Sequence, residues 1–387
     1  MMRQSSKHLS NTQNELLLSV FLMAVASSFV TIYVPIFLLT HGISLRSVML
    51  YCVIVYACTF TTLQIALKLC QYIGTKKVLT LGIVLMAAFY YMLHSLVISK
   101  TFTTIAVVDG SSLGLYFGAY NMLLTKAMKR SHEGHGYALQ LVIGMLAGVL
   151  GPLIGSLIIK QLSFQNLFLV VIVILAITPI PLFFSKEYKP SHESLKLSAV
   201  LTGSPARKRI DRAVFLQGIL YGSGTIWPLF LYIHYPHIVA LGILASISAA
   251  LVLIGTYVIG NSVDKHQGSA YGLGSLFFAP TWLTRLLYVT PIGLAINAFS
   301  ASLFAIAPTM AVSKDIFHTA KLSKSRSAHF SRVEFYMDAG RVTIFGIAFF
   351  TGNLTAMFVV SAFATLCFLG CRPKVYSRKV IKSFANI

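Results

Sequence analysis

Acidic residues are scarce in this chain of 387 residues: Asp and Glu total 10, against 31 Lys and Arg. Charged residues of both signs make up only 11% of the sequence, whereas about a quarter is usual in soluble domains. Hydrophobic residues make up 56%, and the mean hydropathy is +0.78. Because helices satisfy their own backbone polar groups in lipid, this composition predicts an all-α polytopic membrane protein.

Several motifs of enzymes and secreted proteins are also missing. The sequence has no GxxxxGK[ST] phosphate loop and no HExxH, so we expect no ATP-driven chemistry, no catalytic residues, no metal and no cofactor. The five cysteines form no CxxC pair and are expected to be reduced. The cluster Ser131-His-Glu-Gly-His135 fits no defined metal spacing and reads as a solvated loop. We expect no cleavable signal peptide, because the first apolar run is too long.

The chain contains an internal two-fold repeat. Pro35 lies inside the first apolar segment, and Pro228 lies inside the first apolar segment after a basic stretch near the middle. Thirty-six residues beyond each proline, at Gln71 and Asp264, the chain reaches a turn rich in Gly and Lys. Two halves with equal spacing of a proline and a turn indicate two copies of one helical bundle.

Twelve apolar segments are long enough to be transmembrane helices, and the basic residues between them set their orientation. Of the 31 Lys and Arg, 26 lie on one side if both termini are cytoplasmic, as expected in a plasma (inner) membrane.

The predicted domains are an N-terminal six-helix bundle (1–185), a basic cytoplasmic linker (186–212) and a C-terminal six-helix bundle with a basic tail (213–387). The linker reads as a solvated tether, with a short surface helix at 194–201 as the alternative. The twelve spans are predicted near 16–40, 46–70, 78–98, 102–126, 137–159, 165–185, 213–233, 237–260, 270–289, 291–312, 333–352 and 354–371.

The two turns resemble the signature GxxxDRxGRK of the major facilitator superfamily, a resemblance that extends over the whole chain. In the first turn the family's Asp is replaced by Gln71 and its Arg by Tyr72. The resemblance implies two pseudo-symmetric six-helix bundles and a cytoplasmic latch, whose first copy lacks its acidic charge. The matching turn residues are Gly74, Lys76, Lys77, Gly260, Asp264 and Lys265.

The fifth span resembles the helix-five pattern GxxxxxxxxGxxxGPxxGG of exporters and antiporters in that family. Every matching position holds a small residue or Pro, which lets helices approach closely. This pattern favours export, and ordinary tight packing of two membrane helices is the alternative interpretation. The matching residues are Ala138, Ala147, Gly151, Pro152, Gly155 and Ser156.

Charged residues within predicted spans are candidates for coupling or gating, because ionisable groups in lipid are rare and often functional. Asp109 lies within the fourth span, where it could take up a proton or simply form hydrogen bonds. Glu334, Asp338 and Arg341 share one face of the eleventh span and could form a gate, a proton site or a structural charge pair. The family Arg expected in the fourth helix is missing, which weakens any transfer of a known coupling mechanism.

Other polar and aromatic residues are candidates to line a substrate cavity. Arg285, near the outer end of the ninth span, could reach water or form an anion site in the cavity. Prolines and glycines in the first and seventh spans would loosen those helices near the midplane, as in other transporters with inverted repeats. The cavity candidates are Tyr33, Gln64, Asp109, Tyr120, Asn121, Trp227, Tyr232, Arg285 and Asn297.

These features predict a secondary transporter that exports a small organic solute by alternating access, with or without proton coupling. Because the cavity candidates carry few fixed charges, a highly charged substrate is not expected. The alternatives are an uptake symporter of the same fold and a membrane scaffold or enzyme that does not transport. The expected partners are a small-molecule substrate, the lipid bilayer and, under coupling, protons. We expect a monomer and no nucleic-acid partner.

Overall fold

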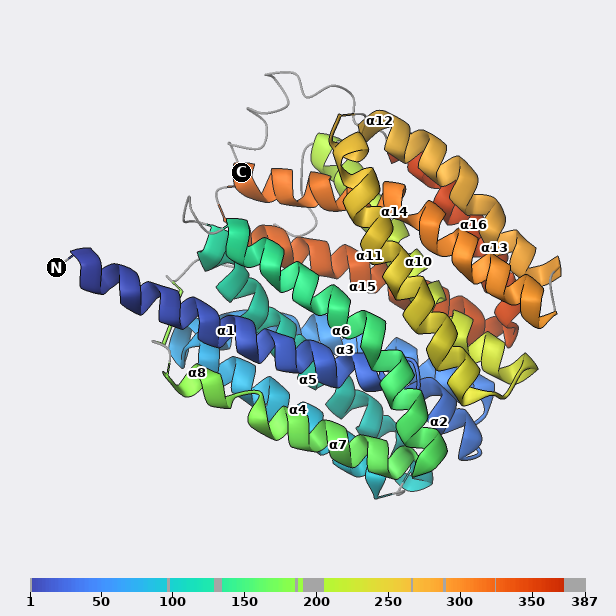
Figure 1. The fold of residues 1–387 in the computed structure, drawn as a ribbon, viewed down its shortest axis with the longest axis horizontal. Helices are drawn as coiled ribbons and strands as arrows, with labels where there is room; N and C mark the ends of the chain where they lie inside the picture. The colour runs from blue at the N-terminus through green and yellow to red at the C-terminus, as the bar shows by residue number, and fades with distance from the viewer. Residues whose placement is uncertain are drawn as a thin grey trace. The chain divides into compact units, whose positions relative to one another are not determined.

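The structure is a computed structural model that describes residues 2–95, 98–128, 134–184, 187–190, 205–265, 267–287, 290–323 and 325–371. Every regular element in these ranges is helical (Figure 1). Nine of the described helices or helix pairs are long and apolar enough to cross a membrane. The predicted fold class is therefore confirmed, and the number of twelve spans stays a prediction.

The helices of the first half follow the predicted spans. The first span is divided into α1 (Met2–Val30) and α2 (Val34–Thr40) by a turn at 31–33. Pro35 explains this break, because it has no backbone N–H to donate to the carbonyl of residue 31. The remaining helices are α3 (Leu45–Tyr72), α4 (Thr75–His94), α5 (Ile98–Met128), α6 (Gly134–Gln161), α7 (Phe164–Ile177) and α8 (Ile180–Phe184).

The helices of the second half repeat this series. The ninth span begins as a five-residue π-helix, η1 (Ala270–Gly274), and the last span ends in a short 3-10 turn, η2 (Phe368–Cys371). The other helices are α10 (Pro205–His234), α11 (Ile238–Lys265), α12 (Gln267–Ser269), α13 (Ser275–Leu287), α14 (Pro291–Leu322), α15 (Arg326–Thr351) and α16 (Leu354–Cys367).

The chain forms two compact units whose boundaries differ from those of the two sequence halves. Unit 1 comprises residues 1–37, 58–193 and 238–246, and unit 2 comprises 38–57, 194–237 and 247–387. Each unit therefore includes one short segment from the other half of the sequence. The division predicted at 185 and 213 follows the repeat in the sequence, whereas the two units follow which helices pack together in the structure.

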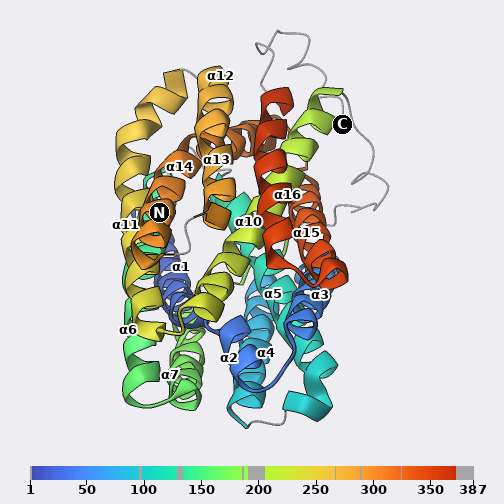
Figure 2. The same cartoon turned by 90° about the vertical axis from the view of Figure 1, so that its right-hand side faces the viewer.

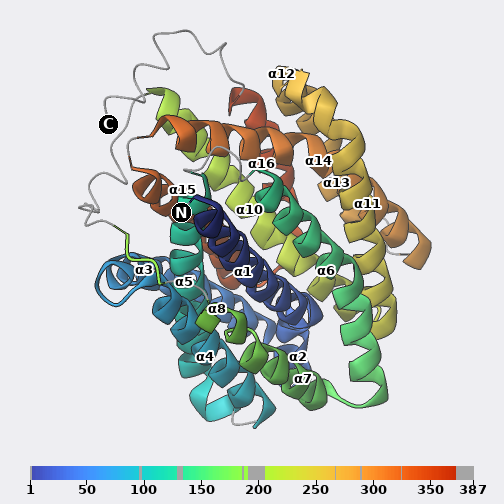
Figure 3. The same cartoon turned by 60° about the vertical axis from the view of Figure 1, so that its left-hand side comes forward.

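Within each unit the same helix pairs pack together. In unit 1, α1 lies against α6, and α4 lies against both α5 and α7 (Figure 3). In unit 2, α10 lies against α15, and α13 lies against both α14 and α16 (Figure 2). These pairs occupy equivalent positions in the two halves, so the internal repeat seen in the sequence is also a repeat of structure.

Small residues bring the principal pair of each unit into close contact. A Cβ added at Gly155 of α6 would strike the carbonyl oxygen of Phe29 in α1. A Cβ at Gly340 of α15 would strike the carbonyl oxygen of Phe215 in α10. Each pair thus packs backbone against backbone, which only glycine at these positions permits.

Candidate functional site

The most distinctive group of polar and aromatic side chains in unit 2 surrounds Arg285. This residue lies in the last turn of α13 and is only 5% exposed. Its guanidinium carbon lies 3.9 Å from the ring centroid of Trp282 and 4.2 Å from that of Trp227. Phe358 of α16 lies next to them, 5.6 Å from the same carbon. Arg285 therefore does not extend to water, and its charge lies among aromatic faces that attract cations.

Hydrogen bonds position the Arg285 side chain on one edge. Its Nε donates to Oδ1 of Asn297 in α14 at 3.2 Å. The Asn297 amide nitrogen donates to the Thr281 carbonyl at 2.7 Å and to Thr284 Oγ1 at 2.6 Å, so the amide itself is fixed. Two buried donors of this cluster lack a hydrogen-bond partner among the described residues: Nη1 of Arg285 and the indole N–H of Trp282. A buried polar atom without a partner is unusual in a native structure and points to a missing ligand or water.

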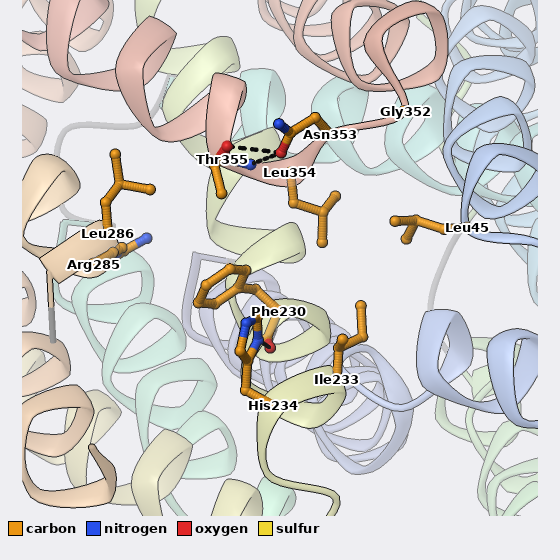
Figure 4. Close-up of a pocket in the computed structure, with 10 residues that line it drawn as sticks. All are labelled: Leu45, Phe230, Ile233, His234, Arg285, Leu286, Gly352, Asn353, Leu354 and Thr355. Atoms are coloured by element: carbon orange, nitrogen blue, oxygen red, sulfur yellow. Dashed lines mark hydrogen bonds between the residues drawn. The ribbon is translucent and has the colours of Figure 1, made fainter. Parts of the chain in front are cut away.

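Arg285 also lines a pocket of about 510 Å³ in unit 2 (Figure 4). The pocket lies at the ends of α10, α13 and α16, and its wall is mostly apolar. Figure 4 shows Arg285 and Leu286 on one side and Leu45 on the opposite side. The lining residues are Leu45, Phe230, Ile233, His234, Arg285, Leu286, Gly352, Asn353, Leu354 and Thr355.

The structure brings together only some of the predicted cavity residues. Trp227, Arg285 and Asn297 form one cluster in unit 2. Trp282 and Phe358 complete it and were not predicted, although the spacing of Trp282 and Arg285, three residues apart on one helix, could have indicated their contact. Tyr232 is half-buried in α10 and does not line the pocket.

The predicted cavity residues of unit 1 lie in several different surroundings. Tyr33 is fully buried, and its hydroxyl donates to the carbonyl of Pro152, so it ties the turn after α1 to α6. Tyr120 stacks on Tyr116 within α5, at 6.1 Å between centroids. Asn121 is buried, whereas Gln64 and Asp109 are half-buried.

The predicted charge face of α15 contains a buried ion pair. Arg341 Nη1 donates to Asp338 Oδ1 at 2.8 Å, and Asp338 is 1% exposed. The Arg341 guanidinium also lies over the ring of Tyr56, at 4.9 Å, and near that of Tyr221, at 5.8 Å. The second carboxylate oxygen of Asp338 has no hydrogen-bond partner. Glu334, one turn earlier on α15, is half-buried.

The first signature turn receives an acidic partner from elsewhere in unit 1. Gly74 has a positive φ of 100° and caps α4. The backbone N–H of Lys76 donates to Glu187 Oε1 at 2.9 Å, and Thr75 donates through its N–H and its hydroxyl to the Tyr188 carbonyl. The Lys76 ammonium donates to the Leu182 carbonyl at 2.8 Å. Glu187, which follows α8, thus supplies a carboxylate to a turn where Gln71 replaces the usual Asp.

The small residues of the fifth span lie in close helix contacts. A Cβ at Gly151 would strike Ser28, and one at Gly242 of α11 would strike Ser156 and the Pro152 carbonyl. Ala147 is buried. These residues therefore lie in tight helix contacts, and the choice between export and ordinary packing stays a prediction.

Several predicted features lie outside the described part of the chain. The side chains of Ala138, Gly260, Asp264 and Lys265 are not described, nor is the stretch 194–201. The cluster at 131–135 is likewise outside the described side chains. Lys77 is exposed in the first turn of α4. Among the residues that are described, no group of three His, Cys, Asp or Glu could hold a metal ion.

Comparison with known proteins identifies the class. The family model of the Major Facilitator Superfamily matches residues 16–371, so the chain belongs to this superfamily. Together with its transporter neighbours, this membership supports an integral membrane protein that acts as a secondary transporter of a small molecule.

The individual relatives are distant. A Bacillus subtilis (strain 168) protein, "Uncharacterized protein YqgE", is 23% identical over 304 residues, which is 73% of this chain and 69% of the relative. The human organic anion transporter MFSD10 has a TM-score of 0.62 at 14% identity, covering 94% of this chain and 99% of the other. A POT family transporter in complex with 5-aminolevulinic acid has a TM-score of 0.73 at 12% identity, covering 94% and 96%. A bacterial homologue of the human lysosomal transporter Spinster, inward-facing and unoccupied, has a TM-score of 0.65 at 12% identity, covering 98% of both.

Proposed function

We propose that this protein is a proton-coupled exporter that moves a small organic solute out of the cell by alternating access. The observation that carries the proposal is the ion pair of Asp338 and Arg341 in α15, whose buried carboxylate has one oxygen without a hydrogen-bond partner. A carboxyl group in lipid surroundings is costly to keep charged, so its protonation is a natural switch.

The pair offers a simple way to connect proton binding to a change of state. When Asp338 takes up a proton, Arg341 loses its ion-pair partner and keeps its contacts with the faces of Tyr56 and Tyr221. Protonation therefore changes which arrangement of α15 is stable, and a ligand that binds one arrangement better can be driven by protons. Glu334 lies on the same face of α15, and we propose that it acts as a gating residue.

Asp109 is the second candidate for coupling, and its surroundings favour it less. It is half-buried, whereas Asp338 is only 1% exposed. We therefore propose Asp338 as the coupling residue and use Asp109 as the comparison.

Two further observations support the direction and the setting. The helix-five pattern resembles that of exporters and antiporters, and one structural relative is described as an organic anion transporter. The proposed location is the plasma (inner) membrane with both termini in the cytoplasm, on the basis of the Lys and Arg distribution. The proposed working form is a monomer with two six-helix halves, 1–185 and 213–387, joined by the linker 186–212.

Transport in everted vesicles tests this proposal. A pH gradient with the acidic side inside the vesicle should accelerate solute entry into everted vesicles that contain the wild-type protein. Asp338→Asn should abolish the response to the gradient while binding and solute exchange at equal pH persist. Asp109→Asn should retain the response. A gradient response that survives Asp338→Asn and disappears in Asp109→Asn would move coupling to α5, and accumulation only in right-side-out vesicles would indicate uptake.

A further inference from the structure

The pocket beside Arg285 has a charge pattern that identifies the class of molecule that fits it. We propose that this pocket binds an organic monoanion, a carboxylate carried on an aromatic or similarly flat apolar body, with Arg285 as its counter-ion. This inference rests on the proposed function and names the substrate class of the transporter.

The first step of the argument is the unbalanced charge. Arg285 is 5% exposed and forms no ion pair with any described residue. Removing a lone cation from water is costly, and aromatic faces compensate only part of that cost. By contrast, Arg332 and Arg341 of the same unit each have an Asp partner. An anionic ligand would be the missing partner of Arg285.

The second step is the geometry of the free donors. Asn297 occupies the Nε edge of the guanidinium, which leaves Nη1 without a partner. The indole N–H of Trp282, whose ring lies 3.9 Å from the guanidinium carbon, is a second free donor in the same cluster. Arg285 itself lines the pocket, and a planar guanidinium binds carboxylates better than a point charge does.

The third step is the shape and chemistry of the wall. A volume of about 510 Å³ lies within the range of small-molecule pockets and holds a ligand with one or two rings. Leu45, Phe230 and Leu354 provide apolar surface around it. Asn353 uses its side-chain oxygen to accept from the N–H and the hydroxyl of Thr355, at 2.8 and 2.7 Å, which leaves its amide nitrogen as a donor.

The fourth step is the sign of the surrounding charge. The lining residues in the described part of the chain include no Asp and no Glu, whereas they include the cation of Arg285. Arg46 lies at the rim, where its Nε is 2.8 Å from the position that a Cβ on Gly352 would take. Cations at the rim and at the base attract anions and repel amines. The pocket is therefore selective by sign as well as by shape.

Equilibrium binding to the purified full-length protein in detergent tests the inference. The probes are benzoate and indole-3-acetate, compared with benzamide and benzylamine, which keep the ring and replace the charge. The carboxylates should bind about tenfold to a hundredfold more tightly than the amide, the usual range for hydrogen bonds to charged groups. Benzylamine should not bind. Equal binding of the acid and the amide would overturn the inference.

Matched variants locate the site. Arg285→Gln should weaken carboxylate binding to the level of the amide, and Arg285→Lys should recover it only in part because the planar fork is lost. Ile233→Trp, which fills the pocket and leaves Arg285 in place, should also abolish binding. Arg212→Gln removes a charge from an exposed position near the beginning of α10, whereas the pocket lies at the end of that helix, and it should leave binding unchanged. Thermal unfolding of each variant confirms that it is folded.

The outcomes separate this inference from the proposed function. Carboxylates that bind through Arg285 but are not transported in vesicles would support the site and contradict the transport proposal. A different solute that is transported, with no carboxylate binding by folded protein, would contradict the site and leave the transport proposal standing. Binding that persists unchanged in Arg285→Gln would assign the anion to another position and overturn the inference.

Discussion

The two units bury different kinds of side chain, although the same helix pairs hold each of them together. Among the described residues, unit 2 buries Arg207, Asp211, Arg285, Asp315, Arg332 and Asp338. The buried polar residues of unit 1 are all neutral, such as Ser112, Asn121 and Ser156. Since the backbone framework is repeated, this difference comes from the side chains that each copy has acquired.

The comparison teaches that packing and chemistry are separable in a repeated fold. Close glycine contacts occur in both units, between α1 and α6 and between α10 and α15. The buried charges, the cation held between tryptophans and the pocket that it lines all belong to unit 2. We therefore expect substitutions at the glycine contacts to change stability similarly in both units. Substitutions of buried charged residues should have large effects in unit 2 that have no counterpart in unit 1.

The largest expected effect comes from breaking the buried pair of Arg332 and Asp211. Arg332 Nε donates to Asp211 Oδ1 at 2.8 Å, and its Nη2 donates to the other oxygen, which fixes the start of α15 against α10. Asp211→Ala leaves a buried cation without its partner and should lower the free energy of unfolding by about 3–5 kcal/mol. Thermal unfolding in detergent measures this.

The control for this pair is the double replacement Asp211→Leu with Arg332→Met. It removes both charges and should recover much of the loss, because Arg332 is no longer a buried cation without its partner. Arg212→Ala, at an exposed position next to Asp211, should change stability little. If Asp211→Ala is as stable as the wild type, the pair does not hold the two helices together.

The next effect tests the packing that the two units share. Gly340→Val in unit 2 and Gly155→Val in unit 1 both force a side chain against a backbone carbonyl. Each should lower the free energy of unfolding by about 1–3 kcal/mol, the usual range for overpacking. Folded yield and thermal unfolding are the measurements.

Matched glycines on the same helices provide the controls. Gly346 in α15 and Gly148 in α6 have nothing within 4 Å of an added Cβ. Valine at either position should be neutral or slightly stabilising, since glycine is a poor helix former. A large loss at Gly346 or Gly148, or a large loss in only one unit at the contact glycines, would show that the units do not pack alike.

The smallest effect near neutral pH is a pH dependence at the start of α15, which grows as the pH falls. His329 precedes the predicted membrane span at 333–352, and burial, followed by the nearby charge of Arg207, lowers its pKa to about 3. The folded protein therefore binds fewer protons than the unfolded chain. Stability should fall by about 1.4 kcal/mol per pH unit as the pH drops below about 6.5, the ordinary value for histidine, until about pH 3.

Substitution of His329 isolates this contribution. His329→Gln keeps a donor for the Ile316 carbonyl, which accepts from the ring Nε2 at 3.0 Å, and removes the titration. Between about pH 6.5 and pH 3, the free energy of unfolding should depend on pH less steeply in this variant, by about 1.4 kcal/mol per pH unit. His41→Gln removes an exposed histidine and serves as the matched control. An unchanged slope in His329→Gln would show that other groups govern acid stability.

Local sequence signals predicted most of the fold. Long apolar runs located the helices, and Pro35 indicated the break between α1 and α2, because these features depend on nearby residues alone. Trp227, Arg285 and Asn297 could be selected as polar or aromatic residues within spans. Their contact with Phe358 could not, because it depends on how α10, α13, α14 and α16 pack.

Pairings between distant residues were the least predictable. Asp211 and Arg332 are 121 residues apart, and neither had been singled out. The loss of Asp at position 71 suggested a turn without an acidic partner, and Glu187 supplies one from more than a hundred residues further along the chain. Which residues carry a charge is evident from sequence, whereas which charges compensate one another depends on the tertiary structure.

The lone charge of Arg285 also has an electrical consequence. With no anion bound, the site carries one positive charge, whereas a bound monoanion would make it neutral. Membrane voltage acts on moving charge, with about 2.3 kcal/mol per elementary charge for each 100 mV. Voltage would then act mainly on the return of the empty carrier and only weakly on the loaded one, so the resting potential would regulate how fast the protein resets.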